Sequence, residues 1–282
     1  MSIIERPGSD CILPSQGKPY GDLLPNGLIT VYSMKTTEEK LFGGLSKKSD
    51  FENVIDTLIS RCTSIPKDLK PSDLYTGDRV FLMMQIRAMS YGKDYGFRAS
   101  CPECGTKWDH SVDLLTGLEI RELDDDWEDP FEIVLPHSGD IVNMRLFRGY
   151  HERRIIDYVD RQSRKVNVRT AGDPGYIYRL ALHIVCVQSK DPKRTFGDKS
   201  SNEAETIAQA IQYVGGLDGP DSSAMREEID ARTPGLLLSV DINCPKCGSE
   251  NNTPLPVTAD FFRASSRPKA HTRTRNVPDA AW

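Results

Sequence analysis

Two short segments of the chain carry the same cysteine pattern. The first reads Cys-Pro-Glu-Cys-Gly over residues 101–105, and the second reads Cys-Pro-Lys-Cys-Gly over residues 244–248. Two thiolates separated by two residues can bind one ion from a tight turn, and the glycine permits the left-handed backbone of such a turn. Two turns together supply four thiolates, a set typical of structural zinc. The predicted ligands of this single Zn²⁺ ion are Cys101, Cys104, Cys244 and Cys247.

Four thiolates leave no open coordination position, so the site is predicted to be structural and the chain is predicted not to be an enzyme. Four alternatives concern the same two segments. Iron can occupy a rubredoxin-like cage, a Cys-x-x-Cys pair can act as a redox dithiol, the two turns could be unrelated, and His110 could replace one thiolate. Strand-like residues flank both patterns, whereas a redox pair is expected at the start of a helix, so zinc is favoured. The chain contains no phosphate-binding loop, zinc-protease motif or nucleophile elbow.

Alternating apolar residues around each cysteine pair predict the strands that must position the thiolates. The expected strands are residues 95–100, 108–114, 236–243 and 253–257. Together they predict a two-knuckle zinc ribbon made of two halves, residues 95–114 and 236–262. About 140 residues separate the two cysteine pairs, so the ion is expected to join distant parts of the chain.

The rest of the chain is predicted to be mainly helical. Capping residues and apolar residues at three- and four-residue steps predict helices at residues 50–62, 78–89, 151–166, 175–187, 200–214 and 221–231. Short strands are expected at residues 28–34, 131–135 and 144–147, the last two pairing across a Ser-Gly-Asp turn. The predicted fold class is α+β, a helical body with short β-hairpins and a zinc ribbon closed by residues about 140 apart.

A division of the chain into four parts follows from these elements. We expect an N-terminal strand and helix segment over residues 1–94, the two-part ribbon, a mainly helical insertion over residues 115–235, and a basic C-terminal arm over residues 263–282.

The net charge of −5 is unevenly distributed along the chain. The arm carries five basic side chains against Asp279, a net charge of +4, which leaves −9 for the rest. A nucleic-acid-binding domain is basic across one face, which an acidic body is not. We expect the arm to bind an acidic neighbouring protein; a frayed terminus is the alternative. The expected partner-binding residues are Arg263, Arg267, Lys269, Arg273, Arg275 and Trp282.

The remaining composition sets the expected compartment. No segment contains 18 consecutive apolar residues, so no membrane span is expected. The first residues lack the apolar core of a secretory signal, so the cysteines are expected to be thiols or metal ligands in a reducing cytoplasm. Cys62 and Cys186 are expected to pack as small hydrophobic residues on apolar helix faces.

With these pieces in place, the chain resembles the T4-like phage baseplate hub family of contractile-tailed viruses. Besides the two cysteine patterns, the resemblance is carried by residues 13–17 (Leu-Pro-Ser-Gln-Gly), 31–36 (Val-Tyr-Ser-Met-Lys-Thr), 74–79 (Leu-Tyr-Thr-Gly-Asp-Arg), 86–92 (Ile-Arg-Ala-Met-Ser-Tyr-Gly) and 255–262 (Leu-Pro-Val-Thr-Ala-Asp-Phe-Phe). The resemblance implies a small protein of the tail baseplate or hub, located in the virion after assembly in the host cytoplasm.

The predicted function is therefore that of a structural, non-enzymatic tail protein. Its expected partners are other baseplate or hub proteins, with no small-molecule substrate, membrane or nucleic acid. Three alternatives stay open at this point. The chain could be a hub-assembly factor that is absent from the virion, a nucleic-acid-binding zinc-ribbon protein, or a thiol redox enzyme. Salt-dependent DNA binding would indicate the second, and a low-potential disulfide without bound metal would indicate the third.

Overall fold

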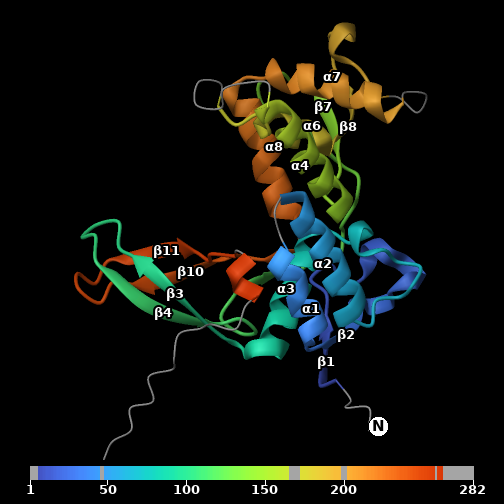
Figure 1. Ribbon diagram of the computed structural model, residues 1–282. Coiled ribbons are helices and arrows are strands. Elements are labelled where there is room, and N and C mark those ends of the chain that lie inside the picture. Colours follow the sequence, from blue (N-terminus) through green and yellow to red (C-terminus); the bar gives the residue numbers. More distant parts are fainter. Residues whose placement is uncertain (1–5, 45–47, 165–171, 198–201, 258, 263–282) are drawn as a thin grey trace, which may run out of the picture.

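Helices and short antiparallel strand pairs alternate along the chain in the computed structural model, which describes residues 6–44, 48–164, 172–197, 202–257 and 259–262 (Figure 1). Three parts are visible in Figure 1. The N-terminal residues form a lower body, two hairpins project from it to one side as the ribbon, and the middle of the chain forms an upper lobe. The α+β class predicted from the sequence is confirmed. None of the described helices is long and apolar enough to cross a membrane.

The lower body is built on two packed helices and one hairpin. Its elements are β1 (Gly8–Ile12), β2 (Leu28–Tyr32), α1 (Thr36–Glu39), α2 (Lys48–Cys62) and α3 (Thr76–Tyr91). The apolar face predicted for α2 is buried, since Ile55, Leu58 and Ile59 are at most 1% exposed. These side chains share one core cluster with Leu82 and Met84 of α3, which explains why both helices form where periodicity predicts them.

The upper lobe packs helices against a three-stranded antiparallel sheet in the order β6-β7-β8. Its elements are β6 (Phe131–Val134), β7 (Ile141–Met144), α4 (Gly149–Ser163), α6 (Tyr176–His183), β8 (Ile184–Gln188), α7 (Glu203–Gly215) and α8 (Gly219–Arg232). Side chains of α6, α7 and α8 share a core cluster with the sheet. A smaller cluster joins α4 to α6 and α7.

Two predicted elements of the upper lobe are wrong. The helix expected over residues 175–187 ends at His183, and the chain continues directly into β8, so Cys186 lies on a strand. Ile184 and Val187 are β-branched and gain cross-strand pairing with β7. The strand expected over residues 144–147 lies earlier, at residues 141–144, because Leu135 N–H donates to the Asp140 carbonyl and closes a tighter turn.

The ribbon consists of two antiparallel hairpins, whose turns lie at the end farthest from the body (Figure 1). Its elements are β3 (Asp94–Ser100), β4 (Lys107–Asp113), β10 (Ser239–Asn243) and β11 (Glu250–Pro254). Near its base, β5 (Ile120–Arg121) pairs with β9 (Gly235–Leu236), where the chain leaves for the upper lobe and returns. The strand expected over residues 236–243 is therefore split in two, and the one expected over residues 253–257 lies earlier, because β11 pairs from Glu250 immediately after the turn.

Buried apolar side chains cross one of the predicted boundaries. One core cluster joins the lower body to the ribbon and includes Leu58, Phe97, Val240 and Phe262. The other two clusters lie in the upper lobe. The N-terminal segment and the ribbon therefore share one core. The division of the chain into four parts remains a prediction.

A buried polar network fixes the lower body to the upper lobe. The Asp78 carboxylate of α3 accepts hydrogen bonds from the Ser15 N–H at 3.0 Å and the Tyr20 hydroxyl at 2.5 Å. The same Tyr20 oxygen accepts from the Tyr75 N–H at 2.8 Å, and the Tyr75 hydroxyl donates to Asp129 next to β6. Because burial raises the pKa of the Asp78 carboxyl, these donors are needed to satisfy it.

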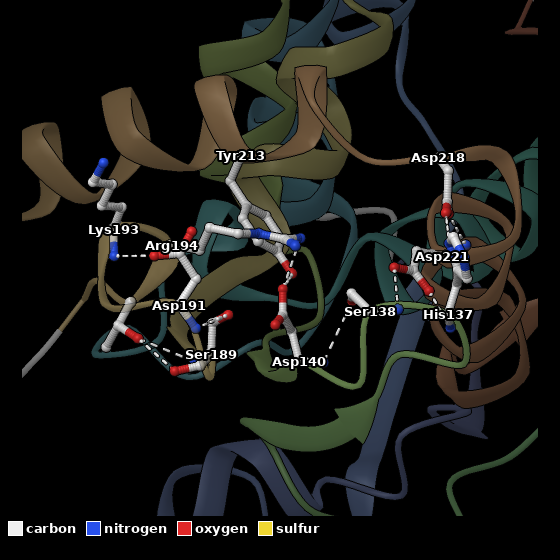
Figure 2. A network of polar contacts seen from close by, with 11 residues as sticks. His137, Ser138, Asp140, Ser189, Asp191, Lys193, Arg194, Tyr213, Asp218 and Asp221 are labelled. Atoms are coloured by element: carbon white, nitrogen blue, oxygen red, sulfur yellow. Dashed lines mark hydrogen bonds and ion pairs between the residues drawn. The ribbon is translucent and has the colours of Figure 1, made fainter.

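A second network fastens the turns of the upper lobe to its helices (Figure 2). The Asp140 carboxylate, beside β7, accepts from the Tyr213 hydroxyl of α7 at 2.9 Å and pairs with Arg194 at 2.7 Å. In the first turn of α8, the Asp221 carboxylate accepts from the N–H groups of residues 137 and 138, at 2.8 and 3.1 Å. Both carboxylates therefore connect the β6–β7 turn to helices that follow it far along the chain.

At Gly77, the first turn of α3 passes against the returning chain. A Cβ atom built on Gly77 would lie 1.7 Å from the carbonyl oxygen of Pro234, an atom of the backbone that cannot rotate away. We predict that Gly77→Ala lowers the free energy of unfolding by about 1–3 kcal/mol, the usual cost of adding a carbon atom where a protein interior has no room for it. Gly219→Ala is the matched control, since a Cβ there meets nothing within 4 Å. Equal unfolding midpoints of the two variants in urea would contradict the close approach.

Two buried histidines stack on one phenylalanine in the upper lobe. The Phe147 ring lies 3.6 Å from the His183 ring and 5.1 Å from the His151 ring, centroid to centroid. Burial and the nearby Arg145 guanidinium lower the pKa of His151 to about 3, and burial lowers that of His183 to about 4. Both imidazoles are therefore neutral in the folded chain, whereas free histidine has a pKa of about 6.5.

Because folding lowers these two pKa values, their contribution to stability is complete above about pH 6.5 and is lost as the pH falls toward 4 and then 3. We predict that the free energy of unfolding falls over this interval. His151→Asn retains an acceptor for the Arg148 N–H, which donates to His151 Nδ1 at 3.0 Å, but does not titrate there. Its slope should be shallower than that of the parent by up to about 1.4 kcal/mol per pH unit. Urea denaturation at several pH values measures this. If the unfolding free energies of the parent and His151→Asn fell equally with pH, the predicted contribution of His151 would be wrong.

Candidate metal centre

The sulfur atoms of the two cysteine pairs meet at the far end of the ribbon. All four Sγ atoms lie within 4.8 Å of one another. Cys101 Sγ is 3.7 Å from Cys247 Sγ, and Cys104 Sγ is 3.6 Å from Cys244 Sγ. A tetrahedral zinc ion with Zn–S bonds of about 2.3 Å holds its sulfurs roughly 3.8 Å apart. The residues present therefore fit one zinc ion, at separations much longer than the roughly 2.05 Å of a disulfide.

The two turns that carry the cysteines are built alike. In each, the N–H of the first cysteine donates to the carbonyl five residues later, at 2.8 and 2.9 Å. The glycine N–H donates back to the carbonyl of the first cysteine, at 3.0 and 2.9 Å. Gly105 and Gly248 have φ angles of +69° and +72°, the left-handed conformation for which the sequence predicts glycine. The repeated motif thus produces two equivalent turns that face each other.

Hydrogen bonds within the first turn stabilise the thiolates of Cys101 and Cys104. Hydrogen bonds from the Thr106 side chain and backbone lower the pKa of the Cys104 thiol to about 6, and backbone N–H groups lower that of Cys101. The Ser249 N–H acts in the same direction on Cys247, but the neighbouring thiols raise the pKa of Cys247 to about 12. Crowded thiolates repel one another, and a divalent ion at their centre removes that repulsion.

The four cysteines differ in burial, and His110 lies outside their cluster. The first cysteine of each pair is buried and the second is exposed. Asn251 Nδ2 lies 3.9 Å from Cys101 Sγ, within reach of a weak hydrogen bond to sulfur. His110, the alternative ligand, is not part of the cluster; its ring packs edge-on against Phe97, with centroids 5.7 Å apart.

Sequence reasoning missed the residue that attaches the ribbon to the body. Arg87 of α3 is 4% exposed, and its guanidinium lies between 5.3 and 5.6 Å from the ring centroids of Tyr91, Tyr95 and Phe261. It also donates to the carbonyl of Gly92 at 2.8 Å. Burial lowers the pKa of Arg87. These contacts join α3, β3 and the last described turn of the chain, so Arg87 orients the ribbon. Its neighbours Ile86 and Ala88 are apolar, and the helical pattern gave no sign that an arginine would be buried there.

The other predicted residues do not join the cluster. Burial raises the pKa of Cys11 to about 12 and of Cys62 to about 11, as expected for unreactive packed thiols. Cys186 lies on β8, in the upper lobe. The arm residues Arg263, Arg267, Lys269, Arg273, Arg275 and Trp282 lie outside the described part of the chain. Phe261 and Phe262, immediately before the arm, are each 1% exposed.

A comparison with protein families now bears on this arrangement. The family model described as "T4 bacteriophage base plate protein" matches residues 10–171, more than half of the chain. The chain belongs to the T4 bacteriophage base plate protein family. Neither a curated protein nor a solved structure matches it. The resemblance to baseplate proteins seen in the sequence is thereby confirmed.

The matched span, residues 10–171, can be located in the fold. It covers β2 to α4 and both ends of the Asp78 network, including Ser15 and Asp129. It contains the first cysteine pair of this base plate family chain but stops well before Cys244. The second half of the metal centre therefore rests on the geometry of the ribbon.

We predict about one zinc ion per chain, because the four clustered thiolates form one closed set. Elemental analysis of protein purified without added metal measures this ratio. Cys247→Ser should lower the zinc content and increase cleavage of the ribbon by protease, since each pair supplies half of the ligand set. Cys186→Ser is the control, because it removes a thiol outside the cluster. If Cys247→Ser and Cys186→Ser retained equal zinc and equal protease resistance, the predicted metal centre would be wrong.

Proposed function

We propose that this chain is a structural subunit of the hub region of a contractile-tail base plate, where it binds neighbouring tail proteins and catalyses no reaction. Membership of the T4 bacteriophage base plate protein family supports a structural role in the tail of the virion. Its proposed partners are other base plate and hub proteins. The proposal includes no small-molecule substrate, no membrane and no nucleic acid, and it places assembly in the host cytoplasm.

The observation that carries a structural role is the closed set of four thiolates. Four sulfur atoms within 4.8 Å of one another use every position of a tetrahedral ion. When bound, the ion supplies a rigid cross-link and leaves no position for a substrate. Cys101 and Cys104 would hold it from one hairpin, and Cys244 and Cys247 from the other. The residues thus serve to fix the two halves of the ribbon, consistent with a subunit that presents surfaces to partners.

Quantitative mass spectrometry of purified virions and tail intermediates tests the proposed location. A permanent subunit should occur in virions at a fixed ratio to known tail proteins. Presence in intermediates but absence from virions would identify a hub-assembly factor instead. Absence from both, together with salt-dependent binding to DNA, would overturn the proposal in favour of a nucleic-acid-binding protein.

We further propose that residues 263–282 form a distinct basic arm that binds an acidic neighbour, completing the four-part organisation predicted above. The preceding Phe262 ring stacks on Phe42, with centroids 4.8 Å apart, so the core of the described residues extends up to the start of the arm. Deleting the arm should therefore leave the body folded and zinc-bound but reduce its incorporation into tails.

The relative contributions of charge and Trp282 can be separated. An exposed ion pair contributes only about 0–1 kcal/mol, whereas full burial of a large apolar side chain contributes roughly 1.5–3 kcal/mol. We predict that Trp282→Ala reproduces much of the defect of the full deletion, measured as chain incorporated per tail. Tails assembled at the parental level by the full deletion would show that the arm does not bind a partner.

A further inference from the structure

The β1–β2 hairpin of the lower body has one covered edge and one free edge. Leu13 N–H donates to the Gly27 carbonyl at 3.0 Å, and Ser33 N–H donates to the Pro7 carbonyl at 3.3 Å. In the antiparallel register, this places the odd-numbered residues of β1 in the hydrogen-bonded pairs with β2. The backbone groups of Gly8, Asp10 and Ile12 therefore point away from β2.

The opposite edge of the hairpin is already occupied. Thr30 N–H donates to Ser64 Oγ at 2.8 Å, and Ser64 N–H donates to the Thr30 carbonyl at 2.9 Å. In the part of the chain that the structure describes, β1 pairs with β2 and with no other strand. Among the described residues, the outward N–H and C=O groups of β1 thus form a row of three positions that no strand pairs, the geometry that accepts an added strand.

The solvent face of the hairpin is apolar beside this free edge. Ile12 and Leu28 lie directly opposite each other and are 58% and 56% exposed. On the other face of β2, Ile29 and Val31 are at most 1% exposed, so the hairpin is packed on one side only. An exposed pair of large aliphatic side chains at the end of an edge strand is unusual for a surface that meets only water.

Asp10 determines which strand this edge can accept. Its carboxylate accepts from the Thr30 hydroxyl at 2.7 Å and lies on the same face as Ile12 and Leu28. In a pair formed by two copies of this chain, the antiparallel register that uses all three outward residues is centred on Asp10. Two carboxylates would then lie directly opposite each other, which destabilises the pair. A cationic side chain in that place stabilises it.

We propose that β1 is a docking edge for an extended segment of another tail protein, with a lysine or arginine opposite Asp10 and an apolar side chain opposite Ile12. The segment adds a third strand to the hairpin, and its apolar side chain extends the Ile12–Leu28 pair. The inference rests on the proposed function, because the partner is supplied by the base plate. It assigns the lower body an interaction surface separate from the ribbon and the arm.

Two substitutions at one position test the free edge. Asp10→Pro and Asp10→Ala both remove the carboxylate, but the proline alone removes the outward N–H, and it leaves the β1–β2 hydrogen bonds in place. In phage lacking the native chain and supplied with each variant, Asp10→Ala should incorporate into tails within about fivefold of the parent. Asp10→Pro should incorporate at least about tenfold less, since a backbone bond is lost and the proline ring obstructs the added strand.

Hydrogen exchange of the unaltered chain provides a measurement that no folding defect affects. The amides of Gly8, Asp10 and Ile12 should exchange rapidly in the free chain and slowly in purified tails, measured by mass spectrometry of peptides covering residues 7–13. Rapid exchange in tails, or equal incorporation of the two variants, overturns the docking edge while the proposed function stands. Absence of the parent chain from tails and intermediates overturns both. Self-association of the purified chain that Asp10→Pro abolishes would identify a second copy as the occupant and overturn the proposed partner.

Discussion

The meeting of two cysteine pairs about 140 residues apart constrains the path of the whole chain. For the four sulfur atoms to lie within 4.8 Å of one another, the chain must leave the ribbon after β4, build the upper lobe and return to β10 beside its starting point. The short β5–β9 pair holds the outgoing and returning segments together. The cost of closing such a long loop rises slowly with its length, so a few well-made contacts at its base can hold it.

Helix α3 connects the three parts that this path creates. Three consecutive residues in its first turn contact three different segments. Gly77 lies against Pro234, Asp78 accepts from the N-terminal segment, and Arg79 Nη2 lies 2.7 Å from Glu52 of α2. Near its other end, Arg87 contacts the rings at the base of the ribbon. Burying charged groups is costly unless they are paired, so these contacts favour one relative arrangement of body, lobe and ribbon.

A structural subunit acts through the surfaces that its fold holds in place. The ribbon turns project far from the lower body, whereas β1 lies on the body itself (Figure 1). The buried contacts at the ribbon base and between α2 and α3 join these surfaces within one fold. Membership of a base plate family implies that such surfaces meet other tail proteins.

Local patterns in the sequence determined much of this protein. The repeated Cys-x-x-Cys-Gly motif predicts two turns and their glycine conformations, because these depend on residues within five positions of one another. The repetition of the motif, not local spacing, predicts that the two turns share one site. Amphipathic periodicity likewise predicts α2 and α3, since each buries one continuous face. Where local preference and sheet pairing competed, only the tertiary structure decided. Residues 184–187 continue the helical pattern of α6, yet they belong to β8 because β7 offers them hydrogen-bonding partners. Arg87 and Asp78 acquire their roles from rings and donors up to 174 positions away, and no pattern within a helix encodes such partners. The sequence therefore specifies the turns and helices, and long-range packing specifies how they are joined.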